Sequence, residues 1–110
     1  MATFHRFEDI ESWKKARELT TLIYKITSIG NFARDFGLRD QIRRASVSIA
    51  SNIAEGFERD GTKEFVQFLY IAKGSAGEVK TQLYLALDLE YITQPDFNSL
   101  FRTADEIGKL

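Results

Sequence analysis

Residues 41–56 are the most informative part of the chain, and they read Gln-Ile-Arg-Arg-Ala-Ser-Val-Ser-Ile-Ala-Ser-Asn-Ile-Ala-Glu-Gly. Apolar residues recur there three or four positions apart, which is the spacing of one face of an α-helix. Small and polar residues fill the other faces, so neighbours can approach this helix closely from several sides. A surface helix needs only one apolar face. We therefore expect this segment to lie at the centre of an assembly.

A helical wheel divides this segment into three stripes. The stripe expected to pack into the core contains Ile42, Ala45, Ile49, Ile53 and Gly56. A polar stripe contains Gln41, Arg44, Ser48, Asn52 and Glu55. The third stripe is mostly small and contains Arg43, Val47, Ala50 and Ala54.

The periodicity predicts one all-α domain over residues 1–110, with helices at about 10–29, 38–57, 63–90 and 94–109. Asp9, Thr62 and Thr93 are the expected N-caps, and Gly30 is expected to end the first helix. Short connections between long helices favour an up-down-up-down four-helix bundle. The last helix stops after only about four turns, so we expect a truncated chain or a missing last turn.

The segment 63–90 carries more apolar residues than a four-helix monomer can cover. Its expected core stripe contains Phe65, Phe68, Leu69, Ala72, Ala76, Val79, Leu83 and Ala86. Val66, Tyr70 and Tyr84 lie to one side of that stripe, while Ile71, Leu85 and Leu89 lie roughly opposite. Gly74 and Gly77 are unfavourable inside a helix, and close approach of another helix would explain them. These features predict a homo-oligomer.

Composition limits the cellular setting and the partners. The chain has 110 residues, no cysteine and a formal net charge of −1. Disulfides and thiolate chemistry are excluded, the N-terminus has no signal-peptide pattern, and no stretch resembles a membrane span. We expect a cytoplasmic protein with no membrane association. The near-neutral charge means that nucleic-acid binding would require a local basic patch.

The residues offer little for catalysis, so we expect no enzyme, no cofactor and no metal site. His5 is the single histidine, and no Glu-x-x-His pair is present. No base accompanies Ser46, Ser48, Ser51 or Ser75 to activate it. No phosphate-binding glycine loop is present, and the carboxylate pair Glu55 and Glu78 remains the weak alternative.

Basic side chains provide candidate phosphate contacts. The candidates for nucleic-acid binding are Lys14, Arg17, Arg39, Arg43, Arg59, Lys63 and Lys73. In a ring, a small patch repeats around the axis, and its contacts add up to salt-dependent affinity. The alternative is that these cations, interleaved with acidic residues, form solvated helix faces with local ion pairs.

The polar residues of two helices predict a structural network. Its members are Arg44, Ser48, Asn52, Glu55, Ser75 and Glu78. Arg44 and Glu55 should be paired if their helix is covered, and Glu78, close to Ser75 and Gln82, is a candidate partner for Arg44. Such a buried pair would fix the register between subunits more than it would add stability. The alternative reading makes the same groups a ligand or nucleic-acid site.

The helical motif 41–49 followed by 51–56 resembles the signature of the bacterial four helix bundle proteins encoded in intervening sequences of 23S ribosomal RNA genes. The segments Phe7-Glu8-Asp9-Ile10, Phe36-Gly37-Leu38 and Lys63-Glu64-Phe65 match as well. Departures from the family pattern are Ala50, where proline is frequent, Ala76, where a larger residue is common, and the early C-terminus.

The resemblance implies a four-helix subunit in a homopentameric ring. The family that the chain resembles has a relative, the accessory variability protein of diversity-generating retroelements, which binds nucleic acid and a reverse transcriptase. We therefore expect a non-catalytic protein associated with RNA or DNA. The alternative is a scaffold that binds another protein and no nucleic acid.

Overall fold

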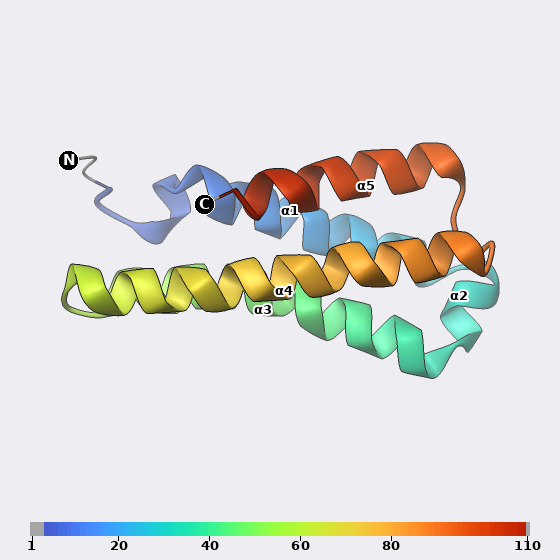
Figure 1. Ribbon diagram of the computed structural model, residues 1–110, viewed down its shortest axis with the longest axis horizontal. Coiled ribbons are helices and arrows are strands. Elements are labelled where there is room, and N and C mark those ends of the chain that lie inside the picture. The colour runs from blue at the N-terminus through green and yellow to red at the C-terminus, as the bar shows by residue number, and fades with distance from the viewer. Residues whose placement is uncertain (1–3, 110) are drawn as a thin grey trace.

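Four long helices form from the periodic segments of the sequence, and two short helices join them (Figure 1). The computed structural model describes residues 4–109. The long helices are α1 (Glu11–Ile26), α3 (Phe36–Glu58), α4 (Thr62–Asp88) and α5 (Gln94–Ile107). The short ones are the 3₁₀-helix η1 (Phe7–Asp9) and α2 (Gly30–Arg34).

The four long helices pack as an elongated all-α bundle of 44 × 23 × 18 Å. In it, α3 packs against α1 and α4, while α5 packs against α4 and α1. Figure 1 shows that α5 accompanies only part of α4, which has 27 residues against the 14 of α5. The turn between α3 and α4 lies beyond the C-terminal end of α5. Part of α4 is therefore covered by α3 without help from α5.

The first long helix ends earlier than the sequence predicts. It stops at Ile26, and just beyond that end the hydroxyls of Thr27 and Ser28 donate to the carbonyls of Ile23 and Tyr24 at 2.7 and 2.6 Å. Gly30 does not end the helix but, at φ +60°, begins α2, an element that the periodicity does not predict.

Capping residues set the other helix ends. Asp35 caps α3 by accepting the backbone N–H of Leu38 at 3.1 Å, so this helix begins at Phe36 rather than near residue 38. The prediction for Thr93 is confirmed, since its hydroxyl accepts the N–H of Asp96 at 3.2 Å. The predictions for Asp9 and Thr62 are wrong: the N-cap positions are Ile10 and Gly61. Neither of these two residues provides a side-chain cap.

The core follows the predicted apolar stripes closely. In α3 the whole stripe of Ile42, Ala45, Ile49, Ile53 and Gly56 is buried. In α4 the buried apolar residues are Ala72, Ala76, Val79, Leu83 and Ala86, while Phe65, Phe68 and Leu69 are half-buried. In α5 the buried residues are Phe97, Leu100, Ala104 and Ile107. The period of the sequence alone therefore identifies most of the interior.

Gly56 allows the closest contact between α3 and α4. A carbon added at its Cβ position would lie 2.6 Å from the Cβ of Phe68 and 3.1 Å from Cδ1 of Phe65. No side chain fits at such distances without movement of the neighbouring helix. This glycine therefore allows the two helices to meet near the α3–α4 turn.

Candidate functional site

A polar groove runs along the outer side of α3 and α4. It has a volume of about 370 Å³ and is lined by Gln41, Arg44, Ala45, Ser48, Ser75, Glu78 and Gln82. At its floor the hydroxyls of Ser48 and Ser75 lie 2.9 Å apart and share a hydrogen bond. The amide of Asn52 donates to the hydroxyl and the carbonyl of Ser48 at 2.9 and 2.8 Å. The structure therefore brings together three members of the predicted network.

The charged members of the predicted network do not join its hydrogen bonds within the described chain. Glu55 is exposed and accepts from Arg59, one turn along the same helix, at 2.8 Å. Arg44 and Glu78 are both exposed at the groove, and no ion pair joins them within the described part of the chain. A buried Arg44–Glu78 pair is thus not formed within one copy, because both helix faces remain open to solvent.

Gln82 is the unsatisfied member of this groove. Its side chain is only 7% exposed, and its Oε1 atom has no hydrogen-bond partner among the residues that the structure describes. A buried polar atom without a partner typically costs about 1–3 kcal/mol. The groove therefore contains one buried acceptor that no described residue satisfies.

The outward surface of α4 carries two apolar stripes. The leucine stripe, which borders the groove, consists of Ile71, Gly74, Glu78, Leu85 and Leu89. The tyrosine stripe, on the other side, consists of Val66, Tyr70, Lys73, Gly77 and Tyr84. Their large apolar side chains are 41–69% exposed. Among these side chains, Tyr84 alone has aromatic neighbours within residues 4–109, namely Phe97 and Phe101 of α5, with ring centroids at 4.9 and 5.4 Å.

Gly74 and Gly77 face open space. A Cβ added at either position would meet no atom within 4 Å in the described chain. The expected close approach of another helix therefore does not occur within one copy. Each glycine weakens an isolated helix by about 1 kcal/mol relative to alanine, and nothing in the bundle compensates for that cost.

Three of the candidate phosphate-binding arginines are engaged inside the chain. Arg43 donates to the hydroxyls of Thr27 and Ser28 at 2.8 and 3.1 Å, and it joins α3 to the end of α1. Arg39 donates to the Asp40 carboxylate at 2.9 Å, and this hydrogen bond lowers the pKa of Asp40. Arg59 is paired with Glu55. Because these three side chains already have partners within the chain, they are less available for contacts with a ligand.

The remaining candidates form two exposed groups. On α1, Lys14 and Arg17 line a shallow hollow of about 370 Å³ with Glu18, Thr21, Leu22 and Lys25. The contact of Lys14 with Glu11 is loose, at 4.0 Å. On α4, Lys63 and Lys73 are exposed, and neither forms an ion pair within residues 4–109. Sequence reasoning missed Lys25, although it lies two helical turns after Arg17 on the same face.

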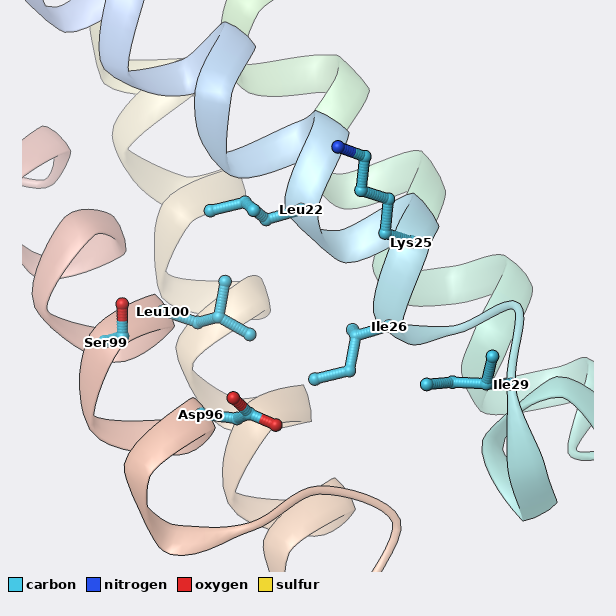
Figure 2. Close-up of a pocket in the computed structure, with 7 residues that line it drawn as sticks. All are labelled: Leu22, Lys25, Ile26, Ile29, Asp96, Ser99 and Leu100. Atoms are coloured by element: carbon cyan, nitrogen blue, oxygen red, sulfur yellow. The ribbon is translucent and has the colours of Figure 1, made fainter.

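A second, more apolar pocket of about 290 Å³ lies between α1 and α5 (Figure 2). Figure 2 shows Leu22 and Ile26 of α1 extending towards Leu100 of α5, with the Asp96 carboxylate at the edge. Ile29, which is 67% exposed, lies beyond the end of α1. This pocket shares Leu22 and Lys25 with the basic hollow. Sequence reasoning missed it because it depends on how far apart two helices lie.

Residues 4–109 contain no cluster of three or more His, Asp or Glu side chains placed to bind a metal ion. Over the same range, no helix is both long and apolar enough for a membrane crossing. The hydroxyl of Ser46, one of the serines considered for catalysis, donates to the Arg43 carbonyl at 2.9 Å.

Comparison with known proteins identifies relatives. Residues 8–110 match the family model described as 23S rRNA-intervening sequence protein. Among solved structures, the chain is similar to a protein with unknown function from the S23 ribosomal protein family of Bacteroides thetaiotaomicron. The two are 31% identical with a TM-score of 0.81, over 89% of this chain and 92% of that one. No curated protein matches the chain.

Proposed function

We propose that this chain, which belongs to the 23S rRNA-intervening sequence protein family, is a non-catalytic helical-bundle protein that self-associates into a ring and binds RNA or DNA. The observation that carries the proposal is the outward surface of α4. There, two apolar stripes and two glycines face solvent, although Tyr84 of the tyrosine stripe also contacts aromatic rings of α5.

Self-association would remove this surface from water. Burial of apolar surface contributes roughly 25 cal/mol per Å², and exposed apolar patches of this kind mark interaction sites. A helix of a second copy would also lie close to Gly74 and Gly77, where the absence of side chains leaves room. The same contact would then account for the exposed apolar residues and the glycines.

The arrangement of the two stripes favours a closed ring. At about 100° per residue, the leucine stripe and the tyrosine stripe point in directions roughly 110° apart around the axis of α4. A helix that meets one neighbour through each stripe turns by a constant angle, so the copies close into a ring rather than a dimer. The family resemblance implies five copies, and an angle of roughly 110° between the stripes is compatible with that number.

The basic row on the outer face of α1 is the proposed contact for nucleic acid. Lys14, Arg17 and Lys25 line one hollow and are free of the strong internal bonds that hold Arg39 and Arg43. A ring repeats this row around its axis, so a few phosphate contacts per copy add up to appreciable affinity. The names of the family and of the solved relative, which refer to 23S rRNA and to ribosomal protein, agree with an RNA partner.

Two measurements test the proposal. Light scattering after size-exclusion chromatography is expected to give about five times the mass of the chain, and a monomer at high protein concentration would overturn the ring. Fluorescence anisotropy with a structured RNA and a DNA duplex is expected to show binding whose log affinity falls linearly with log salt.

A matched pair of charge reversals then locates the contact. Arg17→Glu on α1 is expected to weaken binding about tenfold or more and to reduce the salt dependence. Arg102→Glu makes the same charge change on exposed α5 and is expected to have a smaller effect. Equal effects of the two variants would contradict a site on α1.

A protein partner is the second candidate, and the pocket between α1 and α5 favours it. Ile29 and Leu22 are 67% and 38% exposed beside this pocket, as expected for a surface that accepts an apolar side chain. Absence of nucleic-acid binding even at low salt would overturn the first candidate. Apolar-to-polar changes such as Ile29→Ser should then abolish capture of the protein partner.

A further inference from the structure

The polar groove of α3 and α4 contains groups that one copy leaves without partners. Gln82 Oε1 is buried and accepts no hydrogen bond from the described chain. Glu78 lines the same groove and forms no ion pair within residues 4–109. Both groups are acceptors, and Arg44, the cation in the groove lining, bonds to neither of them within the described chain, so a cationic donor from outside would satisfy the two together.

Lys73 on the tyrosine stripe is a donor without an acceptor. Its side chain is exposed, and none of the ion pairs in the described residues includes it. The tyrosine stripe from Val66 to Tyr84 contains no acidic residue, while the leucine stripe contains Glu78. Both stripes are therefore apolar, and their charges are complementary, since one carries Lys73 and the other carries Glu78.

The spacing of these residues fits a contact between parallel helices. In a ring whose symmetry axis runs along α4, the α4 helices of neighbouring copies are parallel or nearly so. Lys73 precedes Glu78 by five residues, which corresponds to about 7.5 Å along the helix axis. A lysine side chain directed along the helix spans such a distance, and charged residues that flank the apolar seam of parallel coiled coils pair in this manner.

We infer that Lys73 of one copy enters the α3–α4 groove of the next copy, where its ammonium group donates to the Glu78 carboxylate and, once the Gln82 amide turns its buried oxygen towards the groove, to Gln82 Oε1. The inference rests on the self-association proposed above and names the polar site that this contact completes. The apolar members of the stripes, such as Tyr70 and Leu85, surround the pair and exclude water from it.

Such a site sets the register of the ring. Sliding one helix past the next by a turn would leave Lys73, Glu78 and Gln82 buried without partners, and each would then carry its full desolvation cost. The apolar side chains alone discriminate much less between registers, because neighbouring turns of the stripes are alike. The polar site is therefore a device for specificity.

Charge reversal tests the pairing. Assembly is measured by analytical ultracentrifugation without nucleic acid, on the full chain, with circular dichroism to verify the fold. Lys73→Glu and Glu78→Lys are each expected to raise the dissociation constant of the ring at least about tenfold. The combined variant, Lys73→Glu with Glu78→Lys, is expected to recover assembly to within about threefold, because opposite charges face each other again.

Lys63→Glu is the matched control. It makes the same change on an exposed lysine of the same helix, but the position five residues later is Phe68, which offers no acceptor. If Lys63→Glu weakens assembly as much as Lys73→Glu, or if the combined variant stays dissociated, the pairing is wrong. A wild-type protein that is monomeric would instead refute the self-association itself.

Gln82→Met gives an independent test, because it is expected to change the stability of the single chain and the strength of assembly in different directions. Methionine keeps the length of the side chain and removes the unsatisfied oxygen, so the unfolding free energy of the dissociated chain should stay equal or rise. Assembly should weaken, because the lysine of the next copy loses an acceptor. Unchanged assembly in this variant would overturn the role of Gln82, even in a protein that forms the ring.

Discussion

The inner and outer faces of α4 have similar compositions and opposite surroundings. Leu83 is fully buried against the bundle, whereas Leu85, two residues later, is 46% exposed. Leucine carries the same driving force at both positions, and only the neighbours differ. The comparison teaches that one face of α4 stabilises the fold of the single chain, while the other is available for contacts beyond it.

The glycines of the α3–α4 pair show the same difference. Gly56 is necessary inside the chain, because an added Cβ would lie 2.6 Å from Cβ of Phe68. Gly74 and Gly77 have nothing within 4 Å of the corresponding position among the described atoms. No contact within the described chain requires these two glycines, and the proposed self-association would use the room that they leave.

The largest expected effect distinguishes the two leucines. Leu83→Ala should lower the free energy of unfolding by about 2–5 kcal/mol, because it leaves a cavity in the core. Leu85→Ala should change it by no more than about 0.5 kcal/mol in the dissociated chain and should instead weaken assembly. Urea unfolding at two protein concentrations, with ultracentrifugation, measures both effects. Equal losses of stability in the two variants would contradict the division of α4 into two faces.

The next largest effect is expected at two glycines, where substitution by alanine should change the unfolding free energy in opposite directions. Gly56→Ala should lower the unfolding free energy by about 1–3 kcal/mol through overpacking. Gly77→Ala should raise it by up to about 1 kcal/mol, since alanine favours the helix and meets no neighbour. Thermal unfolding of dilute protein measures the sign for each variant. A destabilised Gly77→Ala chain under conditions where it is monomeric would show that this position is packed within the bundle.

The sequence predicts the buried stripe of α3 fully, because Ile42, Ile49 and Ile53 need only the period of the helix to specify their face. The exposed apolar stripes of α4 are also confirmed. The observed helix ends differ by a few residues from the predicted ones where side chains form hydrogen bonds with the backbone. The Asp35 side chain, for example, caps α3 and starts it at Phe36 rather than near residue 38, a contact that apolar periodicity does not register.

Partners of long polar side chains were the least predictable part of the site. A wheel places Arg43 on a face, but only the packing of α1 against α3 brings it 2.8 Å from Thr27. In the same way, Glu55 pairs with Arg59 along its own helix rather than with a residue of α4. Which of several polar neighbours a long side chain bonds to depends on distances of a few ångströms. Those distances are set by the angle and separation at which two helices cross, and residue spacing in the sequence does not reveal them.

Tyr91, just after α4, gives a smaller effect at alkaline pH. Its hydroxyl donates to Asp35 at 2.9 Å, and this hydrogen bond raises the pKa of Tyr91 above its ordinary value of 10.0. The bond therefore adds stability below pH 10 that disappears as the pH rises through the raised pKa. Tyr91→Phe should be less stable than wild type at neutral pH, and the difference should shrink in alkaline urea titrations. A constant difference would contradict the bond.

The smallest expected effect lies at the border between the two faces of α4, where half-buried Lys80 donates to Asp105 of α5 at 3.1 Å. This hydrogen bond lowers the pKa of Asp105 below its ordinary value of 3.8. A depressed folded-state pKa adds stability that is present above pH 3.8 and is lost as the pH falls through the lowered value. Asp105→Asn should therefore be slightly less stable than wild type at neutral pH and converge with it in acid. Exposed Asp60→Asn is the control that should show no such convergence, since Asp60 forms no ion pair in residues 4–109. If Asp105→Asn keeps a constant deficit down to acid pH, the carboxylate acts through packing rather than charge, and α5 is held to α4 by its apolar residues alone.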